Sequence, residues 1–566
     1  MEKSALEHYS ESIYSHPISK DTIEIRLRTK LGDDIKKVEL LYADKFKFYK
    51  GVKTLEIKET VSDDCFTFYI VRLKLKDKRL AYIFKLTTFK NHVFYFSESG
   101  VTEDYDIKKG HYDFFQLPYI NDTDLIKIHK NFQNRVVYQI FVDRFNKSED
   151  NLNPKININW GDDVNGFSLA GGNLKGISAK LDYLQDLGVD CLYLTPISKA
   201  NTNHKYDTVD YYEIDSDFGD KTDLLNLVKE LHKRNMIIIL DGVFNHVAIN
   251  NPLFEDVIKN GKNSKYYKWF FIHGKRVNLL KPNYETFAYT KYMPRLNLNN
   301  PEVQDYVLDV AKYYVCTFKI DGYRLDVSDE IPHSFWAKFN IELRKTNKNI
   351  VIIGENWHNA QAFLNSGFEF DSIMNYSINK ELLNFIAWEK YTALQFKNRV
   401  VSDLMRYKTN VNYNLMNLCS SHDVARFINL CKEDEDKMLL GYAFLFMHIG
   451  IPCIYYGDEI GMTGSGDPKC RQCFEWNPSK WNQKIYHAMK LLIKYHKEKL
   501  INERDYSIDV SNDLVVVTRK SLQNSIILYM NMSKETKKIP IEGKALVGNK
   551  YHANTLEYKG FVIIER

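Results

Sequence analysis

In the stretch KTDLLNLVKELHKRNMIIILDGVF (221–244), a helical pattern runs directly into an apolar, β-branched segment. The same alternation continues on both sides, with helical patterns at 174–188 and 299–315. Eight short apolar runs follow one another, at 136–141, 191–197, 236–244, 322–327, 351–357, 370–376, 414–421 and 453–457. Strand–helix alternation repeated eight times predicts an α/β fold, a parallel (β/α)8 TIM barrel.

Three domains are expected in the 566 residues. Residues 1–122 carry closely spaced strand patterns without a long helical one, which predicts an N-terminal β-sandwich. Residues 123–497 hold the barrel, with an inserted excursion at about 247–293 that is too long for an ordinary connection. Strand patterns return after it, so we expect a small C-terminal β-sandwich domain over 498–566.

The composition is that of an ordinary soluble globular protein, with 44% hydrophobic and 27% charged residues. A net charge of +5 gives no reason to expect nucleic acid or an anionic membrane as a partner. The first 17 residues have no apolar signal core, so we expect a cytoplasmic protein. Eight scattered cysteines suit a reducing compartment, and the lone pair Cys470 and Cys473 is a weak indication of zinc.

One uncharged stretch, 438–457, has about the length of a membrane span. Pro452 lies inside it and should end a helix near Gly450. We therefore expect a buried helix up to about Ile449, a turn, and a short buried strand from Cys453 to Tyr456.

Polar residues cluster where the predicted strands end, which in such a barrel is the side that carries the active site. They are Asp241, Asn245, His246, Arg324, Asp326, Glu355, His422 and Asp423. Arg324 and Asp326 are two apart on one strand and face the same side, so the guanidinium should lower the pKa of Asp326. Glu355 follows the apolar run VIIG, which should raise its pKa. One charged and one protonated carboxyl group suit a retaining glycosidase, whereas structural ion pairs are the alternative.

Short boxes in this order resemble the α-amylase family, glycoside hydrolase family 13. They are DGVFNH (241–246), GYRLDVSDE (322–330), GENWH (354–358) and SSHD (420–423). MPRLN (293–297) is similar to the MPKLN box of the neopullulanase, cyclomaltodextrinase and maltogenic amylase branch. Further matches are VVYQIFVDRF (136–145), GGNLKGISAKLDYLQDLGVDCLYLTPI (171–197), NHKYDTVDYYEID (203–215) and IPCIYYGDEIGM (451–462). The N-terminal strands also resemble the carbohydrate-binding domain of this branch.

The resemblance implies a role for each matching residue. Asp326 would be the nucleophile, Glu355 the general acid and base, and Asp423 the stabiliser of the transition state. The substrate-binding residues would be Tyr206, His246, Arg324, Trp357 and His422. Asp241 is expected to support Asn245 and its loop, while Asp458 and Glu459 are expected to be scaffold.

Two departures from the family pattern stand out. Many relatives bind calcium in the loop after DRF, whereas this chain has Lys147, Glu149 and Asn173 near the ligand positions. A cation and a lost carboxylate disfavour a hard ion, so we expect no metal or cofactor, or only weak calcium binding. The second box ends in SDE instead of the branch's usual ANE, so Asp329 could alter the preference on the leaving-group side.

The resemblance implies a hydrolase of α-1,4, and in some relatives α-1,6, links in cyclodextrins, maltooligosaccharides or pullulan, with some transfer to sugar acceptors. It also implies a homodimer in which one N-terminal domain covers the partner's active site. Two alternatives stay open: a transglycosylase or sugar isomerase on the same fold, and a non-catalytic carbohydrate-binding protein.

Overall fold

The computed structural model describes residues 1–566 except 109–111, 501–504, 521–523 and 541–542. The chain forms two compact units. The first contains Met1–Ile128, Leu364–Gly367 and Leu394–Tyr413. The second contains His129–Phe363, Phe368–Ala393 and Asn414–Arg566.

Two antiparallel sheets build the first unit, as the strand patterns predicted. One sheet has the order β1-β2-β6-β5 and the other β4-β3-β7-β8-β9, with β10 on β7. The bounds are β1 Ser15–Pro17, β2 Thr22–Lys30, β3 Lys37–Ala43, β4 Lys53–Glu56, β5 Glu59–Ser62, β6 Phe66–Lys74, β7 Leu80–Thr87, β8 Val93–Ser97, β9 Gly100–Thr102 and β10 Phe115–Leu117. Alternate residues of β2 and β7, such as Ile23, Ile25, Tyr82 and Phe84, form the core between the sheets.

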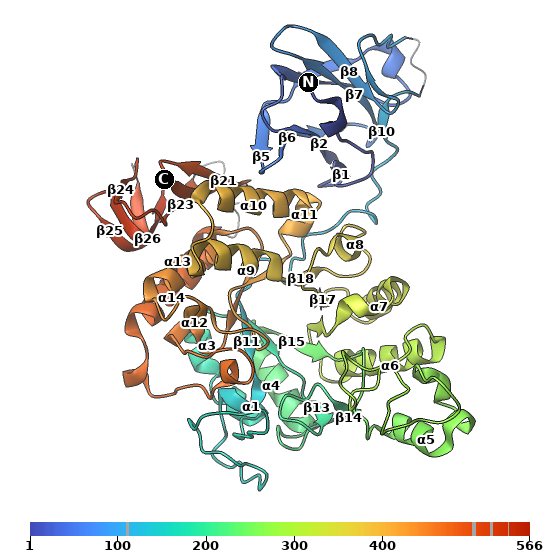
Figure 1. Ribbon diagram of the computed structural model, residues 1–566, viewed down its shortest axis with the longest axis vertical. Helices are drawn as coiled ribbons and strands as arrows, with labels where there is room; N and C mark the ends of the chain where they lie inside the picture. The colour runs from blue at the N-terminus through green and yellow to red at the C-terminus, as the bar shows by residue number, and fades with distance from the viewer. Residues whose placement is uncertain (109–111, 501–504, 521–523, 541–542) are drawn as a thin grey trace. The chain divides into compact units, whose positions relative to one another are not determined.

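A closed parallel barrel forms the centre of the second unit and confirms the predicted fold class (Figure 1). Its strands are β11 Val137–Ile140, β12 Cys191–Leu194, β15 Ile237–Gly242, β16 Gly322–Leu325, β17 Val351–Gly354, β18 Ser372–Asn375, β19 Met416–Leu418 and β20 Ile451–Tyr455. Each lies in or overlaps one of the eight apolar runs. The barrel closes where β11 pairs with β20, with Val137 opposite Cys453. Inward side chains such as Val137, Tyr193, Ile239 and Met374 fill its interior.

The helices start where the sequence provides caps. The Asp220 side chain accepts from the Asp223 amide at 2.9 Å and caps α4. Asn300 does the same for the Glu302 amide of α6 at 3.0 Å, with Pro301 as the first helical residue. The helices are α1 Val142–Phe145, α2 Leu174–Ser178, α3 Leu181–Leu187, α4 Lys221–Lys233, α5 Pro252–Asn260, α6 Pro301–Thr317, α7 His333–Thr346, α8 Gln361–Leu364, α9 Tyr376–Leu382, α10 Ala393–Met405, α11 Thr409–Asn412, α12 Phe427–Leu430, α13 Glu435–Met447 and α14 Gln483–Tyr495.

The uncharged stretch forms α13 followed by β20, a buried helix and a buried strand. The predicted boundary was wrong by two residues, because the strand starts at Ile451 and contains Pro452. No helix among the described residues combines the length and the apolar character needed to cross a membrane.

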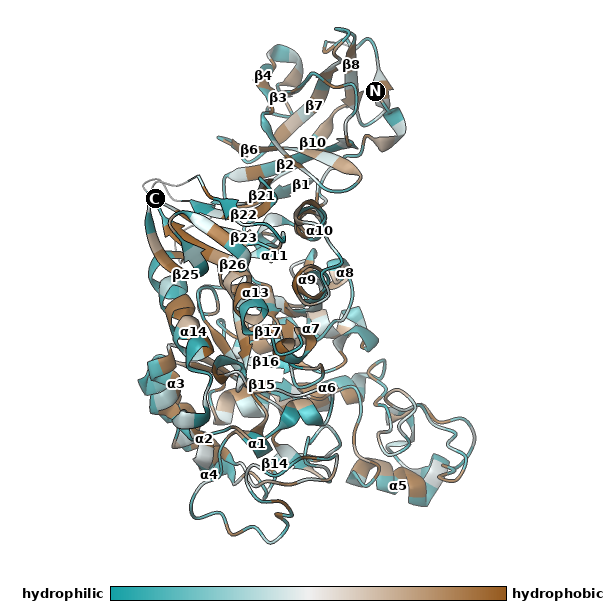
Figure 2. Cartoon of the chain, turned by 60° about the vertical axis from the view of Figure 1, so that its left-hand side comes forward, coloured by the Kyte–Doolittle hydropathy of each residue, from teal (hydrophilic) through white to brown (hydrophobic). Residues whose placement is uncertain are grey.

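The excursion and the C-terminal strands complete the second unit. The excursion contains α5, two 3-10 helices (Gly261–Asn263 and Tyr267–Trp269), turns and isolated bridges. The strands β13 Ser198–Ala200 and β14 Thr208–Ile214 form a separate ribbon after β12. The C-terminal strands β21 Asp505–Ser511, β22 Leu514–Lys520, β23 Ser525–Asn531, β24 Lys537–Lys538, β25 Lys544–His552 and β26 Thr555–Glu565 form one antiparallel sheet. Figure 2 shows hydrophobic residues along strands of this sheet and along α9. Because the sheet packs on α13, it belongs to the same compact unit as the barrel.

Candidate active site

A cavity of about 730 Å³ opens at the carboxyl ends of the barrel strands. Its walls include seven of the residues discussed above: Tyr206, His246, Asp326, Asp329, Glu355, Trp357 and Asp423. Two other predicted site residues, Arg324 and His422, lie beneath this lining and are fully buried. The predicted site residues therefore come together in one place, in two layers.

One buried guanidinium holds three carboxylates together under the cavity. Arg324 Nη1 lies 2.9 Å from an oxygen of Asp326 and 2.9 Å from an oxygen of Asp241. Its Nη2 lies 2.7 Å from Glu355 Oε1, an ion pair without hydrogen-bond alignment. Arg324 is on β16 and Glu355 directly follows β17, so the pairing of two neighbouring strands creates this cluster.

The chain turns sharply immediately after Asp326. Val327 has φ 48° and ψ 43°, a left-handed conformation that is unfavourable for a β-branched residue. This turn directs the Val327 amide to Glu355 Oε2 at 2.9 Å. The strained residue thus links the chain beside Asp326 to the second carboxylate.

The predicted electrostatics of Asp326 were wrong in direction. Burial raises the pKa of Asp326 well above its ordinary value, the negative charge of Glu355 raises it further, and Arg324 opposes both effects. The sequence indicated the neighbouring charge of Arg324, but it did not indicate how deeply Asp326 is buried. Asp326 consequently holds a proton more readily than an exposed aspartate does.

Polar groups surround the Glu355 carboxylate, so the predicted apolar surroundings of this residue were also wrong. Besides Arg324 and Val327, the Trp357 indole N–H donates to Oε1 at 3.2 Å. Trp357 stacks on Tyr376 with ring centroids 4.0 Å apart, yet 44% of it stays exposed. One side chain can therefore both position Glu355 and offer an aromatic surface to a ligand.

Asp423 is held between a histidine and an arginine. One oxygen lies 3.0 Å from His422 Nε2, and the other accepts from Arg471 Nη2 at 3.2 Å. Although 27% of this side chain is open to the cavity, desolvation by the surrounding protein raises its pKa, against the opposing charges of Arg324 and Arg471.

Tyr206 connects this pair to the arginine cluster. Its ring is stacked on that of His422, with centroids 5.5 Å apart, and its hydroxyl donates to Asp241 Oδ2 at 2.8 Å. Tyr193 donates to the same oxygen at 2.7 Å. Asp241 thus supports Arg324 and two tyrosines, and the expectation that it orients Asn245 was wrong.

His246 contacts the backbone of Tyr206. Its Nε2 is 3.2 Å from the Tyr206 carbonyl oxygen, and its ring stacks on Phe287 of the excursion with centroids 4.9 Å apart. The excursion therefore contributes a wall of the cavity.

Comparison with known proteins identifies the family. Residues 139–512 match the model described as Alpha amylase, catalytic domain, and residues 1–121 match Alpha amylase, N-terminal ig-like domain. The chain belongs to the α-amylase family. It is 38% identical over 560 residues to a cyclomaltodextrinase of Geobacillus thermopakistaniensis (strain MAS1), covering 97% of this chain and 95% of the relative. It is also 38% identical over 542 residues to the intracellular maltogenic amylase of Bacillus subtilis (strain 168), covering 94% and 91%. A solved cyclomaltodextrinase structure superimposes with a TM-score of 0.90 at 30% identity, covering 100% of this chain and 98% of the other.

Several residues that line or support the site in this α-amylase family member were missed. Arg471 contacts Asp423 and pairs with Asp467 at 2.9 Å, and His204 lines the cavity. Arg471 lies between Cys470 and Cys473, and the spacing of these two cysteines was interpreted only as a weak indication of zinc. Both cysteines are buried and free. His204 was inside a matched box, NHKYDTVDYYEID, and could have been chosen from it.

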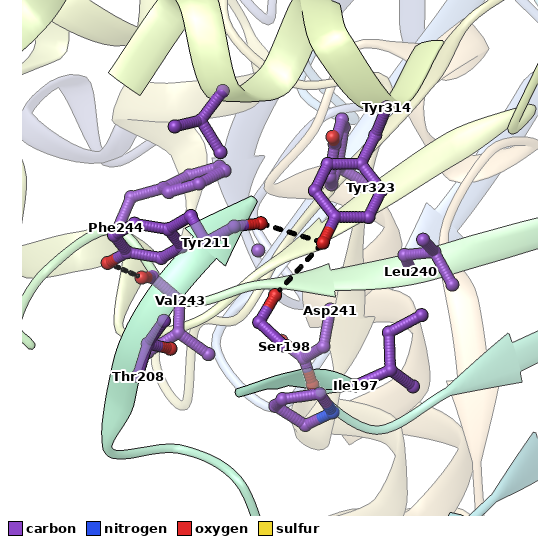
Figure 3. A pocket seen from close by; sticks show the side chains of 13 residues that line it. Ile197, Ser198, Thr208, Tyr211, Leu240, Asp241, Val243, Phe244, Tyr314 and Tyr323 are labelled. Carbon is purple, nitrogen blue, oxygen red and sulfur yellow. Dashed lines mark hydrogen bonds between the residues drawn. The ribbon is translucent and has the colours of Figure 1, made fainter. Parts of the chain in front are cut away.

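A second cavity is lined by residues of β14, β15 and α6, among them Tyr211, Leu240 and Tyr314 (Figure 3). Its volume is about 20 Å³, enough for a water molecule only. The Tyr314 hydroxyl donates to the Tyr211 carbonyl oxygen there at 2.7 Å and lies 3.2 Å from Ser198 Oγ (Figure 3). This cavity is a packing defect between strand and helix and not part of the site.

The loop after DRF, where the family resemblance predicted altered calcium ligands, is closed by direct hydrogen bonds. Asn173 Oδ1 accepts from the Gly176 amide at 2.7 Å and caps α2. Asn173 Nδ2 donates to Ser148 Oγ at 2.8 Å, while Lys147 and Glu149 are exposed. Among the described residues no group of three or more His, Cys, Asp or Glu could hold a metal ion.

We propose that this loop needs no calcium. Excess EDTA should leave the thermal unfolding midpoint unchanged, and calcium titration should give no stoichiometric heat, because Asn173 Oδ1 already accepts from the Gly176 amide and no carboxylate replaces it as a ligand. The control is Asn173→Asp with Lys147→Ser, which adds a carboxylate, removes a cation and keeps an acceptor for the helix cap. Tight calcium binding by the unmodified protein would contradict the proposal.

Proposed function

We propose that this protein is a retaining α-glucan hydrolase that cleaves α-1,4 and also α-1,6 glucosidic bonds in cyclodextrins, maltooligosaccharides or pullulan, with some transfer to sugar acceptors. One observation carries the proposal. Asp326 and Glu355 share one buried guanidinium and line a cavity of sugar size, which Asp423 also lines. Two facing carboxyl groups are what a retaining mechanism requires.

In the first step Asp326 attacks the anomeric carbon, and the glucosidic C–O bond breaks as Glu355 gives its proton to the leaving oxygen. In the second step Glu355 takes a proton from water, and the water oxygen attacks the anomeric carbon while the bond from that carbon to the Asp326 oxygen breaks, which frees Asp326. Asp423 would stabilise the positively charged sugar in both transition states. The Arg324 hydrogen bond to Asp326 favours the charged nucleophile, which offsets part of the cost of burial.

Replacing the nucleophile tests this mechanism. Asp326→Asn should lower turnover of maltotriose, a cyclodextrin and pullulan by about four orders of magnitude or more, while maltodextrin binding persists. Asp182→Asn, a matched change on the exposed side of α3, should leave turnover unchanged. Rates on the three sugars and starch would be measured with products identified.

The same assay separates the alternatives. A carbohydrate-binding protein would bind maltodextrin but show no turnover in the unmodified chain, and a transglycosylase or isomerase would convert maltotriose without net hydrolysis. Equal turnover by Asp326→Asn and the unmodified protein would reject the nucleophile assignment.

The raised pKa of Asp326 has a kinetic consequence. Asp326 must be charged to attack, so activity is lost as the pH falls through its pKa, well above the value of about 4 of an exposed aspartate. When the pair of carboxyl groups holds one proton, an ionised Glu355 keeps that proton on Asp326. Glu355→Gln removes this negative charge and should move the acid limb to lower pH. The measurement is kcat/KM against pH with α-maltosyl fluoride, because fluoride leaves without a proton donor.

Glu330→Gln is the control for that shift, since it removes a carboxylate of the cavity wall whose charge is not among the main causes of the raised pKa of Asp326. Its acid limb should stay where the unmodified protein has it. An unmoved limb in Glu355→Gln would show that the two carboxyl groups are not coupled.

We also propose a cytoplasmic homodimer. The location is supported by the name of the intracellular maltogenic amylase relative, and the dimer by the resemblance to its branch of the family. A partner over the cavity would favour short or cyclic substrates over starch. Sedimentation equilibrium should give twice the 66.6 kDa chain mass, and a monomer with high starch turnover would contradict this part.

A further inference from the structure

A buried amide lies beneath the site and has no part in the mechanism described above. Gln139 is on β11, its side chain is fully buried, and its Nε2 lies 2.6 Å from His422 Nδ1. Within the described part of the chain, its Oε1 has no hydrogen-bond partner. Burying an amide in a barrel interior costs free energy unless the amide is hydrogen-bonded. The bond to His422 is therefore the interaction that offsets this cost for Gln139.

The neighbouring hydrogen bonds fix the direction of this one. The Tyr206 hydroxyl donates its only hydrogen to Asp241 Oδ2, an oxygen that also accepts from Tyr193. The Tyr206 oxygen can therefore only accept from His422 Nε2, which is 2.5 Å away.

The other neighbour of His422 Nε2 imposes the same direction. Asp423 Oδ2, 3.0 Å from it, is an acceptor when ionised. Two acceptors face Nε2, so this nitrogen carries the hydrogen. In the neutral ring Nδ1 is then the acceptor, and a donor must face it. The network thus identifies the Gln139 atom near His422 as the amide nitrogen.

We propose that Gln139 is a positioning residue that holds His422 in its neutral form with the hydrogen on Nε2, directed at Asp423 and Tyr206. Its amide N–H occupies the Nδ1 lone pair, and the other ring nitrogen is left as a fixed donor to the third carboxylate. The inference rests on the proposed function only where activity is the readout.

The charged groups around His422 agree with a neutral ring. Arg471 donates to its carbonyl oxygen at 2.8 Å, and Arg324 lies beneath the same cluster. Glu355 and Asp423 oppose these positive charges from the cavity side. Burial lowers the pKa of His422 well below its ordinary value, and the two arginines lower it further.

Two substitutions of Gln139 separate positioning from packing. Gln139→Met keeps the length without a donor and should lower kcat about 10- to 100-fold with a smaller change in KM. Gln139→Glu places an acceptor at Nδ1, which draws a hydrogen there and raises the pKa of His422. Above that pKa the neutral ring keeps its one hydrogen on Nδ1, and Nε2 can no longer donate to Asp423. The alkaline limb of kcat/KM should therefore move to lower pH.

The control is Asn340→Leu on α7, which removes another buried amide, one that donates to the Glu369 carbonyl oxygen at 2.9 Å. It should reduce stability and leave the pH profile unchanged. In a His422→Ala background, Gln139→Met should cost little more, because its effect passes through the histidine. An unmoved alkaline limb in Gln139→Glu, or fully additive costs in the double variant, would overturn the proposal.

Neutron diffraction of the unmodified protein gives a readout that does not depend on activity. The proposal requires deuterium on His422 Nε2 and none on Nδ1, and the reverse pattern would reject it. An unmodified protein inactive on every α-glucan would instead reject the proposed function and leave this assignment to the diffraction result.

Discussion

The site depends on one buried positive charge. Arg324 has no exposed surface, and a guanidinium in that position is stable only if anions and acceptors surround it. Asp241, Asp326 and Glu355 supply them, and each of these carboxylates in turn needs the cation. Removing one member would leave uncompensated charge in the barrel, so the cluster is held as a unit.

This constraint explains why a strained residue is tolerated beside the nucleophile. A left-handed conformation at a β-branched residue costs about 1–3 kcal/mol. At Val327 it turns the chain away from β16 and aims an amide at Glu355, so the two carboxylates are linked through backbone as well as through Arg324. Backbone geometry of this kind is set by the closed barrel, which fixes both strand ends at once.

The sequence was sufficient for what depends on local pattern. Eight apolar runs became eight strands, and Asn300 and Pro301 began a helix where capping rules placed it. It was insufficient where an effect depends on depth or on distant partners. The burial that raises the pKa of Asp326 and the polar donors around Glu355 are not visible in a strand pattern. Arg471 reaches Asp423 from 48 residues away, and Asp241 meets Tyr193 from a neighbouring strand, so neither contact has a local signal.

A perturbed carboxyl group does not by itself mark the site. Burial raises the pKa of Glu459 to about 7, yet its oxygens accept from Tyr138, Tyr183 and the Gly457 amide and are closed off from the cavity. It has the bonds of a scaffold group, as expected from its box. Asp326, Glu355 and Asp423 differ because they combine burial with an open face on the cavity. Charge that is both desolvated and within reach of a ligand distinguishes the three from the other buried acids of the barrel.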